Sequence, residues 1–491
     1  ADRRSRRRVK RPGRRSAGEP PATSPRLREC PGCGLLQMVP ALTPGTSAQC
    51  ARCPTILRRA SAHRLDHIIA LTVAALVLLA VMCTSALMSV ETVGIRHVAD
   101  LFSGPAELVR QDMAPLAAVV LFVTVLAPFI RLFGTLYVLV RAHENMPPHH
   151  LRRVFALCER LRPWSMLDVF VLGVLVAYAK LGGLVEIGLR AGVYALFALT
   201  VVFVWVDAAL DREKVWERLD HGDRPDHGDR PDHGNRPGAM PGRLDGAVGC
   251  ETCGLVSLAQ PDDRRCPRCG SILHRRRPNS VARTWALVIA AAIIYIPANY
   301  YPVLTVVQLG AGMPSTIIGG VEELIQTREY PLAALVFFAS ILVPVLKLVG
   351  LSVMLTATQT GHAGWLRDRT RLYHIIRFIG RWSMIDIFME SLLGALVTFG
   401  AVITIQPGMG ALAFCAVVVL TMFAAETFEP RLMWDAAASG RAPTAAGAGT
   451  IGASTIGPQH DRPQHDRSLT ASGSRAAMAP VNRTRDARWM I

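Results

Sequence analysis

Long apolar runs separated by polar loops form the main pattern of the sequence. We count eight such runs, and each is close to the roughly twenty residues that a helix needs to cross the hydrocarbon core of a membrane. The pattern therefore predicts an all-α polytopic membrane protein. The approximate cores of the expected spans are 67–90, 114–140, 166–185, 190–210, 283–306, 331–357, 384–404 and 408–427.

Basic residues are concentrated in every second loop. Segment 1–66 holds 15 Lys and Arg against 4 acids, and loops 141–163 and 358–381 hold five Arg each. Loops 91–113 and 307–330 hold only three Arg between them. The positive-inside rule then places both termini and the middle of the chain in the cytoplasm. Because no apolar stretch precedes the first run, we expect no cleavable signal peptide.

The net charge of +17 changes this picture little. A strongly basic chain can indicate nucleic-acid binding. Here the arginines lie in the loops that orient the spans, where they also contact anionic lipid headgroups. We therefore expect membrane and lipid as partners, and no nucleic acid.

The chain repeats itself with a period of about 216–220 residues. Each half contains a Cys-rich module followed by four expected spans, and since four is even, both halves have the same orientation. The prediction is two parallel repeats of four helices, each preceded by a small β zinc-ribbon domain. Residues Pro115, Pro128, Arg131, Gly134, Trp164, Ser165 and Asp168 correspond to Pro331, Pro344, Lys347, Gly350, Trp382, Ser383 and Asp386.

Eight of the 11 cysteines form four C-x2-C pairs. Two residues between thiols let both sulfurs bind one ion from a tight knuckle, and a second knuckle completes a tetrahedron. The candidate ligands of the first module are Cys30, Cys33, Cys50 and Cys53, and those of the second are Cys250, Cys253, Cys266 and Cys269.

Two structural zinc ions are the cofactors that we favour, because a reducing cytoplasm disfavours disulfides. Rubredoxin-like iron uses the same ligands and stays an alternative, as does a redox disulfide. The modules are short, so we expect the metal to fold them. We expect Cys83, Cys158 and Cys415, which lie in or beside spans, to be packing residues.

Composition indicates the boundaries between domains. The tract H-G-D-R-P-D, repeated within 221–238, is interpreted as a solvated linker, with metal binding by its histidines as the alternative. The expected division is a disordered basic tail 1–25, zinc ribbon 26–62, transmembrane repeat 63–212, linker 213–244, zinc ribbon 245–276, transmembrane repeat 277–428 and disordered tail 429–491.

Several polar residues lie inside the apolar runs, where an ionised side chain costs roughly 2.5–3.5 kcal/mol. Ser340 and Lys347 are two helical turns apart and share a face. We hypothesise a Lys347–Asp386 pair that could relay protons or switch conformation. Its hydrogen-bond neighbours would be Ser340, Ser383 and Thr421, and Glu390 lies on the same face as Asp386, while Asp168 and Arg131 are the first-half counterparts.

A structural explanation competes for part of this set. S-x-x-D before an apolar run is typical of a capping box, in which Ser165 or Ser383 caps a helix whose third position is the aspartate. This alternative explains both copies of the motif without a function. It does not explain Lys347, which lies some ten residues inside its run.

Taken together, the motifs resemble those of the paraquat-inducible protein A family. The likeness covers about 26–428 and rests on W-S-M-x-D-x-F at 164–170 and 382–388, I-P-A-N-Y-Y-P at 296–302 and P-V-L-K at 344–347. It implies a non-enzymatic, multi-pass subunit in the bacterial inner membrane. This subunit would pass phospholipid or another lipid to or from a periplasmic MCE-domain tunnel and so support envelope integrity.

The resemblance also implies roles for single residues. The eight cysteines would be metal ligands, and Asp168, Lys347, Ser383 and Asp386 would be intramembrane polar positions. The chain departs from the pattern at Pro54, where the other three knuckles have glycine. Two other functions remain open on the sequence alone: a membrane-bound iron–thiolate redox protein, and a secondary transporter of a small solute.

Overall fold

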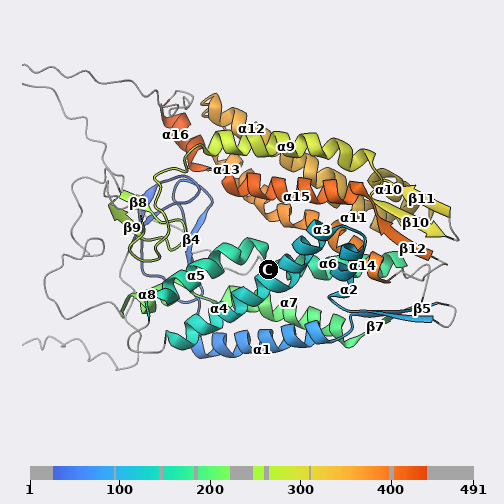
Figure 1. Ribbon diagram of the computed structural model, residues 1–491. Helices are drawn as coiled ribbons and strands as arrows, with labels where there is room; N and C mark the ends of the chain where they lie inside the picture. Colours follow the sequence, from blue (N-terminus) through green and yellow to red (C-terminus); the bar gives the residue numbers. More distant parts are fainter. Residues whose placement is uncertain are drawn as a thin grey trace, which may run out of the picture.

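The structure is a computed structural model that describes residues 26–92, 95–142, 148–181, 186–221, 247–258, 265–308, 311–396 and 403–439. It is mostly helical, with two Cys-rich modules at one end and two small sheets at the other (Figure 1). The His-rich tract after His221 lies outside the described residues, so the linker interpretation stays a prediction.

Seven helices are long and apolar enough to cross a membrane. In the first half they comprise α1 (Leu65–Thr84), α3 (Ala114–Leu121) joined to α4 (Ala127–Arg141), α5 (His150–Leu161) joined to α6 (Leu167–Leu181), and α7 (Ala191–Ala209). In the second half they comprise α9 (Ser280–Tyr300), α11 (Tyr330–Phe337) joined to α12 (Val343–Gln359), and α15 (Met409–Thr427). The remaining helices of the two halves are α2 (Ser103–Arg110), α10 (Ile317–Gln326), α13 (Leu366–Ile379) and α14 (Ile385–Leu396).

The expected span 384–404 is described only in part. Helix α14 ends at Leu396, residues 397–402 lie outside the described part, and a strand begins at Ile403. The count of eight spans therefore stays a prediction.

A proline interrupts the second span of each half in the same way. Pro128 and Pro344 follow π-helical turns at Phe122–Leu126 and Phe338–Leu342. Proline has no N–H to donate and its ring crowds the carbonyl four residues earlier, which widens the helix there. That carbonyl belongs to Thr124 or Ser340, whose hydroxyls donate back to Val120 and Val336 at 2.7 Å.

The prediction of an all-α membrane part is wrong at the end opposite the modules. Each half has a three-stranded antiparallel sheet there (Figure 1). One contains β5 (Met88–Thr92), β6 (Ile95–Ala99) and β7 (Glu186–Leu189), and the other contains β10 (Leu304–Gln308), β11 (Ala311–Ser315) and β12 (Ile403–Pro407). The apolar runs continue past the helix ends into segments such as L-T-V-V-Q, so hydropathy alone could not separate helix from strand.

The first Cys-rich module is a pair of hairpins, and the described residues of the second form one hairpin and one further strand bridge. The first module contains β1 (Arg26–Glu29) with β2 (Leu36–Val39), and β3 (Ser47–Gln49) with β4 (Ile56–Arg59). The second contains β8 (Ala247–Gly249) with β9 (Val256–Leu258), and a single bridge from Arg265 to Ile272.

Each module packs against the opposite half of the membrane part. The cysteines of the first module share a buried cluster with second-half residues, among them Leu351 and Tyr373. The cysteines of the second share one with first-half residues, among them Leu151 and Phe155. This crossing ties the two halves together, and no sequence pattern predicts it.

Two helices lie where the sequence predicted linker and disordered tail. Helix α8 (Arg212–His221) places Trp216 against the ring of Phe155, with centroids 4.9 Å apart. Helix α16 (Arg431–Ser439) places Trp434 under the guanidinium of Arg52. The expected boundaries at 213 and 429 are therefore wrong. Both helices are short and charged, so their stability depends on tertiary contacts, including the packing of one large aromatic residue in each.

Candidate metal centres and intramembrane polar sites

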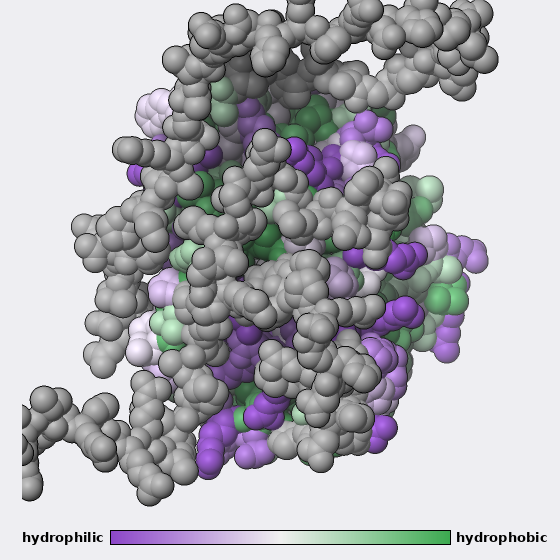
Figure 2. All heavy atoms as spheres, turned by 90° about the vertical axis from the view of Figure 1, so that its left-hand side faces the viewer, coloured by the Kyte–Doolittle hydropathy of each residue, from purple (hydrophilic) through white to green (hydrophobic). Residues whose placement is uncertain are grey.

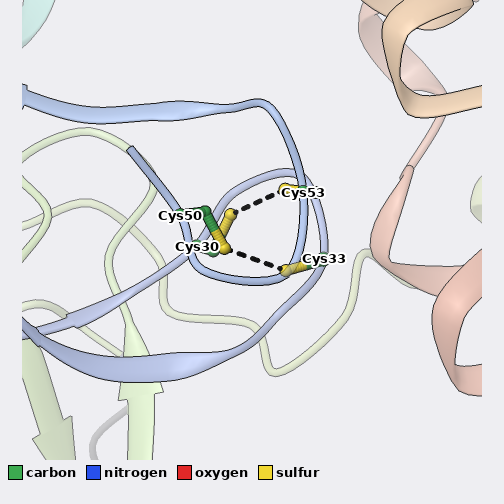
Figure 3. Close-up of side chains that lie close together, drawn as sticks. All are labelled: Cys30, Cys33, Cys50 and Cys53. Carbon is green, nitrogen blue, oxygen red and sulfur yellow. Dashed lines mark hydrogen bonds between the residues drawn. The ribbon is translucent and has the colours of Figure 1, made fainter. Parts of the chain in front are cut away.

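Each Cys-rich module brings four buried sulfurs to one point. The four sulfurs of each set lie within 4.8 Å of one another. The sulfurs of Cys30 and Cys53 are 3.5 Å apart, and so are those of Cys33 and Cys50. Figure 3 marks both pairs with dashed lines. The second module has two matching pairs at 3.5 Å. Zn–S bonds of about 2.3 Å in a tetrahedron place sulfurs about 3.8 Å apart, so the sites fit a metal.

Glycine is needed in three of the four knuckles. Gly34, Gly254 and Gly270 have φ near +70°, which other residues adopt at a cost. Each donates its N–H to the carbonyl of the first cysteine of its knuckle, as Gly34 does to Cys30 at 2.8 Å. Pro54 stands in the fourth knuckle, yet Cys50 and Cys53 still join the cluster. The departure at Pro54 thus leaves the ligand set intact.

A buried arginine links the two modules, and the sequence did not indicate it. The guanidinium of Arg431, on α16, donates to Glu29 at 3.0 Å, to Glu251 at 2.6 Å and to Glu429. Glu29 precedes Cys30, and Glu251 follows Cys250. Burial alone would lower the pKa of Arg431, but the hydrogen bond to Glu429 and the carboxylates of Glu29 and Glu251 raise it above its ordinary value.

Helix α16 is positioned further by two contacts. The indole N–H of Trp434 donates to Thr370 of α13 at 3.2 Å. Asp435 accepts from Arg276 at 2.6 Å. The carboxyl-terminal helix therefore touches both modules and the second half.

Figure 2 shows the module end, where hydrophilic side chains (purple) lie among hydrophobic ones (green). Glu251 is among the charged residues of this part of the molecule. Burial would raise its pKa, but the hydrogen bond and charge of Arg277 outweigh burial and lower it.

Lys347 is buried, with 2% of its surface exposed. Its ammonium donates to the carbonyl of Gly380 at 2.8 Å and to the hydroxyl of Thr421 at 3.4 Å. Thr421 in turn donates to Val418 at 2.9 Å. A Cβ at Gly380 would lie 3.3 Å from Cε of Lys347, so the glycine makes room for the lysine. The structure thus brings together two of the expected neighbours, Lys347 and Thr421.

The expected partner Asp386 belongs to α14, but its side chain lies outside the described part. The Lys347–Asp386 pair therefore stays a prediction. Lys347 and Thr421 line a cavity of about 300 Å³ whose rim carries Arg162 and Arg381.

Ser340 and Glu390 occupy a different place. They line a small cavity of about 50 Å³ together with Phe414. Ser340 is 1% exposed and Glu390 is 6% exposed. The expected network therefore divides into one group around Lys347 and another at the π-helical turn of the sixth expected span.

The capping interpretation is wrong for Ser383. Its hydroxyl is buried and has no hydrogen-bond partner among the described atoms. A 3₁₀ turn over Gly380–Met384 joins α13 to α14 with helical backbone angles, so α14 has no free N-terminus that a side chain could cap. In the first half, Ser165 donates to the carbonyl of Leu161 at 3.4 Å.

The two copies of W-S-M-x-D-x-F meet at the contact between the halves. Phe170 and Phe388, the last residues of the two motifs, pack edge to face with centroids 5.4 Å apart. Gly173 lets α6 and α14 approach, because a Cβ there would lie 2.8 Å from that of Phe388. Asp168, 41% exposed, lies 3.9 Å from Arg381. Asp168 is thus an inter-half ion-pair residue rather than a member of a buried network.

Arg131 has a carboxylate partner that the sequence analysis missed. It forms an ion pair with Asp207 of α7, and its guanidinium lies 4.7 Å from the ring centre of Phe203. An aspartate at the end of the apolar run 190–210 was the available signal. The corresponding second-half cation, Lys347, meets a hydroxyl and a carbonyl instead.

Of the remaining cysteines, Cys158 and Cys415 are buried and Cys83 is half-buried. Cys415 belongs to the main core cluster. The sulfur of Cys158 lies 2.5 Å from where a Cβ of Gly134 would be. These contacts agree with the packing role that we expected.

Comparison with known proteins gives matches along most of the chain. The family model described as Paraquat-inducible protein A matches residues 65–220 and 281–438. The Intermembrane transport protein PqiA of Escherichia coli K12 is 33% identical over 83% of this chain and 95% of its own length.

Two further relatives extend this comparison. The Lipophilic envelope-spanning tunnel protein A of E. coli K12 is 31% identical over 84% of this chain and 92% of its own length. A Probable intermembrane transport protein of Haemophilus influenzae is 26% identical over 84% of this chain and 97% of its own length. No solved structure matches.

Proposed function

Because the chain belongs to the paraquat-inducible protein A family, we propose that it is a membrane subunit that moves lipid between the two membranes of a bacterial envelope and so supports envelope integrity. The observation that carries the proposal is the 33% identity to an intermembrane transport protein over 95% of that protein's length. A second relative is named as a lipophilic envelope-spanning tunnel protein, which supports lipid as the cargo. We propose transport without an enzymatic step.

The architecture that we propose is eight spans in two parallel repeats of four, with one zinc ribbon before each. The separate matches of the family model to 65–220 and 281–438 support the duplication. So does the meeting of Phe170 and Phe388 from equivalent positions in the two halves. The domain division proposed from the sequence then needs α8 and α16 moved into the folded part.

We propose that each module holds zinc. The four buried thiols of each set, at 3.5 Å separations, support a tetrahedral thiolate site. Iron would fit the same ligands and would make the protein a redox carrier. Metal analysis of protein purified without added metal separates the two, since iron–thiolate sites are red and zinc sites colourless. One zinc per module is the expected result, and stoichiometric iron would overturn it.

The orientation that we propose places the modules and both termini in the cytoplasm. The two three-stranded sheets lie at the other end of the molecule, where they would face the periplasm and meet an MCE-domain protein (Figure 1). A reporter fused after α16 should be active only in the cytoplasm. A reporter inserted after Thr92, between β5 and β6, should be active only in the periplasm.

Within the membrane part we propose that the second half does the work. Arg131 of the first half is neutralised by Asp207, whereas the described partners of Lys347 are uncharged. The 300 Å³ cavity beside Lys347 gives this buried cation access to a ligand. A lipid phosphate is an anion that an ammonium at this depth would attract.

Reconstitution tests the proposed function. The full chain in vesicles is mixed with a periplasmic MCE-domain protein of the same bacterium and with acceptor vesicles. The account predicts transfer of fluorescent phospholipid that needs both proteins and that falls at least tenfold with Lys347→Met. Transfer of a small hydrophilic solute, with no lipid transfer, would favour a secondary transporter instead.

A further inference from the structure

A second cavity, of about 570 Å³, lies between the two modules and the end of the first half. Its walls are β4 of the first module, the α7–α8 junction, and the knuckle at Cys250 of the second module. This cavity shares Arg162 with the cavity at Lys347, and its other lining residues are different. A volume of this size is typical of small-molecule sites.

The acidic residues of the cavity wall all have cationic partners. Glu213 pairs with Arg26 and Arg28, and Glu159 pairs with Arg212 at 3.1 Å. Asp211 is 3.5 Å from Lys214. Asp207 pairs with Arg131 and Arg162, Glu29 with Arg276 and Arg431, and Glu251 with Arg277 and Arg431.

Among the buried cations of this wall, Arg58 of β4 is the one without an acidic partner in the described residues. It is 8% exposed, and within the described part of the chain its side chain makes no ion pair or hydrogen bond. Its Nε is fully buried without a partner. A buried guanidinium without a counter-charge is costly, because desolvation is not offset by attraction.

Neighbouring charges increase this cost. Arg28 is close enough for its charge and that of Arg58 to repel each other, and Arg28 already shares Glu213 with Arg26. Arg28 also lies against Gly254 at the second module's knuckle, so the negative charge of a metal–thiolate centre there acts first on Arg28. The wall carries six arginines and six carboxylates, and because each carboxylate already has a cationic partner, Arg58 is left as a buried cation without a counter-charge.

We propose that this cavity binds a phosphate-bearing anion and that Arg58 is its principal ligand. Guanidinium groups bind phosphate through paired N–H donors, and the volume leaves room for a group attached to the phosphate. A bound anion would touch both modules and the α7–α8 junction, and so would hold the two modules in their crossed arrangement. The proposal does not depend on lipid transport.

The test uses the full chain, with its metal, in nanodiscs of phosphatidylcholine. Pyrophosphate is titrated at constant ionic strength while the thermal unfolding midpoint and the heat of binding are recorded. We expect a saturable rise in the midpoint, with chloride inactive. Arg58→Met should weaken binding at least tenfold, whereas Arg58→Lys, which keeps the charge but not the fork, should weaken it less.

Arg64→Met is the matched control, because Arg64 is exposed at the start of α1 and its replacement removes the same charge as Arg58→Met. Without ligand, Arg58→Met should melt no lower than the original chain, since it removes an unpaired buried charge; this shows that the variant folds. A second series with phosphatidic acid in the nanodisc and no soluble phosphate identifies the source. A stabilisation that Arg58→Met abolishes would assign the site to a lipid headgroup. Absence of binding from either source, or equal binding by Arg58→Met, would overturn the proposal.

Discussion

The buried cluster around Arg431 gives the sharpest test of how the modules are held. The perturbation is Arg431→Met, which keeps most of the side-chain volume and removes the guanidinium. Glu29 and Glu251 keep Arg276 and Arg277 as partners. Glu429, with 2% of its side chain exposed, loses the two hydrogen bonds that Arg431 donates to it.

The expected loss of stability depends on how many of the three carboxylates keep a cationic partner. Removing one partner of a buried ion pair costs about 3–5 kcal/mol, and because two of the three carboxylates keep a partner we expect the lower end, about 3 kcal/mol. That free energy corresponds to roughly a 100-fold increase in the fraction of opened modules. Hydrogen exchange of the backbone amides in 26–59 and 247–258 measures it directly.

The second substitution makes the reasoning refutable. Arg431→Met leaves the buried carboxylate of Glu429 without its partner, and Glu429→Gln removes that charge. The amides of the double variant should therefore be better protected from hydrogen exchange than those of Arg431→Met alone. The control is Arg371→Met, which replaces an exposed arginine of α13 and should leave exchange unchanged. If the module amides of Arg431→Met exchange as slowly as those of the control, or if those of the double variant exchange faster than those of the single variant, then Arg431 does not hold the modules together.

Three other outcomes are expected. Gly173→Val should separate α6 from α14, because the added Cβ would lie 2.8 Å from that of Phe388. Such overpacking costs about 1–3 kcal/mol and should lower the thermal unfolding midpoint in detergent, whereas an unchanged midpoint would contradict the contact. Burial and the charge of Arg377 lower the pKa of His374, whose Nε2 lies 3.1 Å from the hydroxyl of Thr55. The neutral ring therefore stabilises the fold above the unfolded pKa of 6.5, and this stability is lost as pH falls below that value. Protection of the first module from hydrogen exchange should drop from pH 7.5 to pH 6, and His374→Asn should flatten that pH profile. Chelation of the metal should expose 26–59 and 247–273 to protease before the membrane helices, and equal rates for all segments would show that metal does not fold the modules.

Much of the membrane part could be predicted from the sequence, because spans and metal knuckles are local patterns. Seven spans and both Cys sets follow from apolar run length and from C-x2-C spacing. The terminal strands could not be separated from the helices, because β12 (Ile403–Pro407) continues an apolar run. Helix α16 was missed because its stability comes from Trp434 and Arg431 meeting Arg52 and Glu29, which lie hundreds of positions away.

The candidate site was predicted in parts. Depth along the run identified Lys347 and Thr421, which the structure brings within hydrogen-bond distance. The S-x-x-D motif predicted Ser383 as a cap, but a cap requires a free helix start, and the 3₁₀ turn from α13 removes it. Asp207 was overlooked because its pairing with Arg131 crosses from one helix to another, which spacing within a single run cannot reveal.

Photo-crosslinking beside Lys347 directly tests whether phospholipid enters the cavity of the second half. A photo-crosslinking residue replaces Met422, which lines the Lys347 cavity, or Val206, which lies at the corresponding first-half position beside Asp207. Replacement of Ile293, 62% exposed on α9, reports capture of bulk lipid. The account predicts that Met422 captures phospholipid in cells, that Val206 does not, and that Lys347→Met abolishes the Met422 product. Capture at Ile293 with none at Met422 would contradict the assignment of this cavity to lipid.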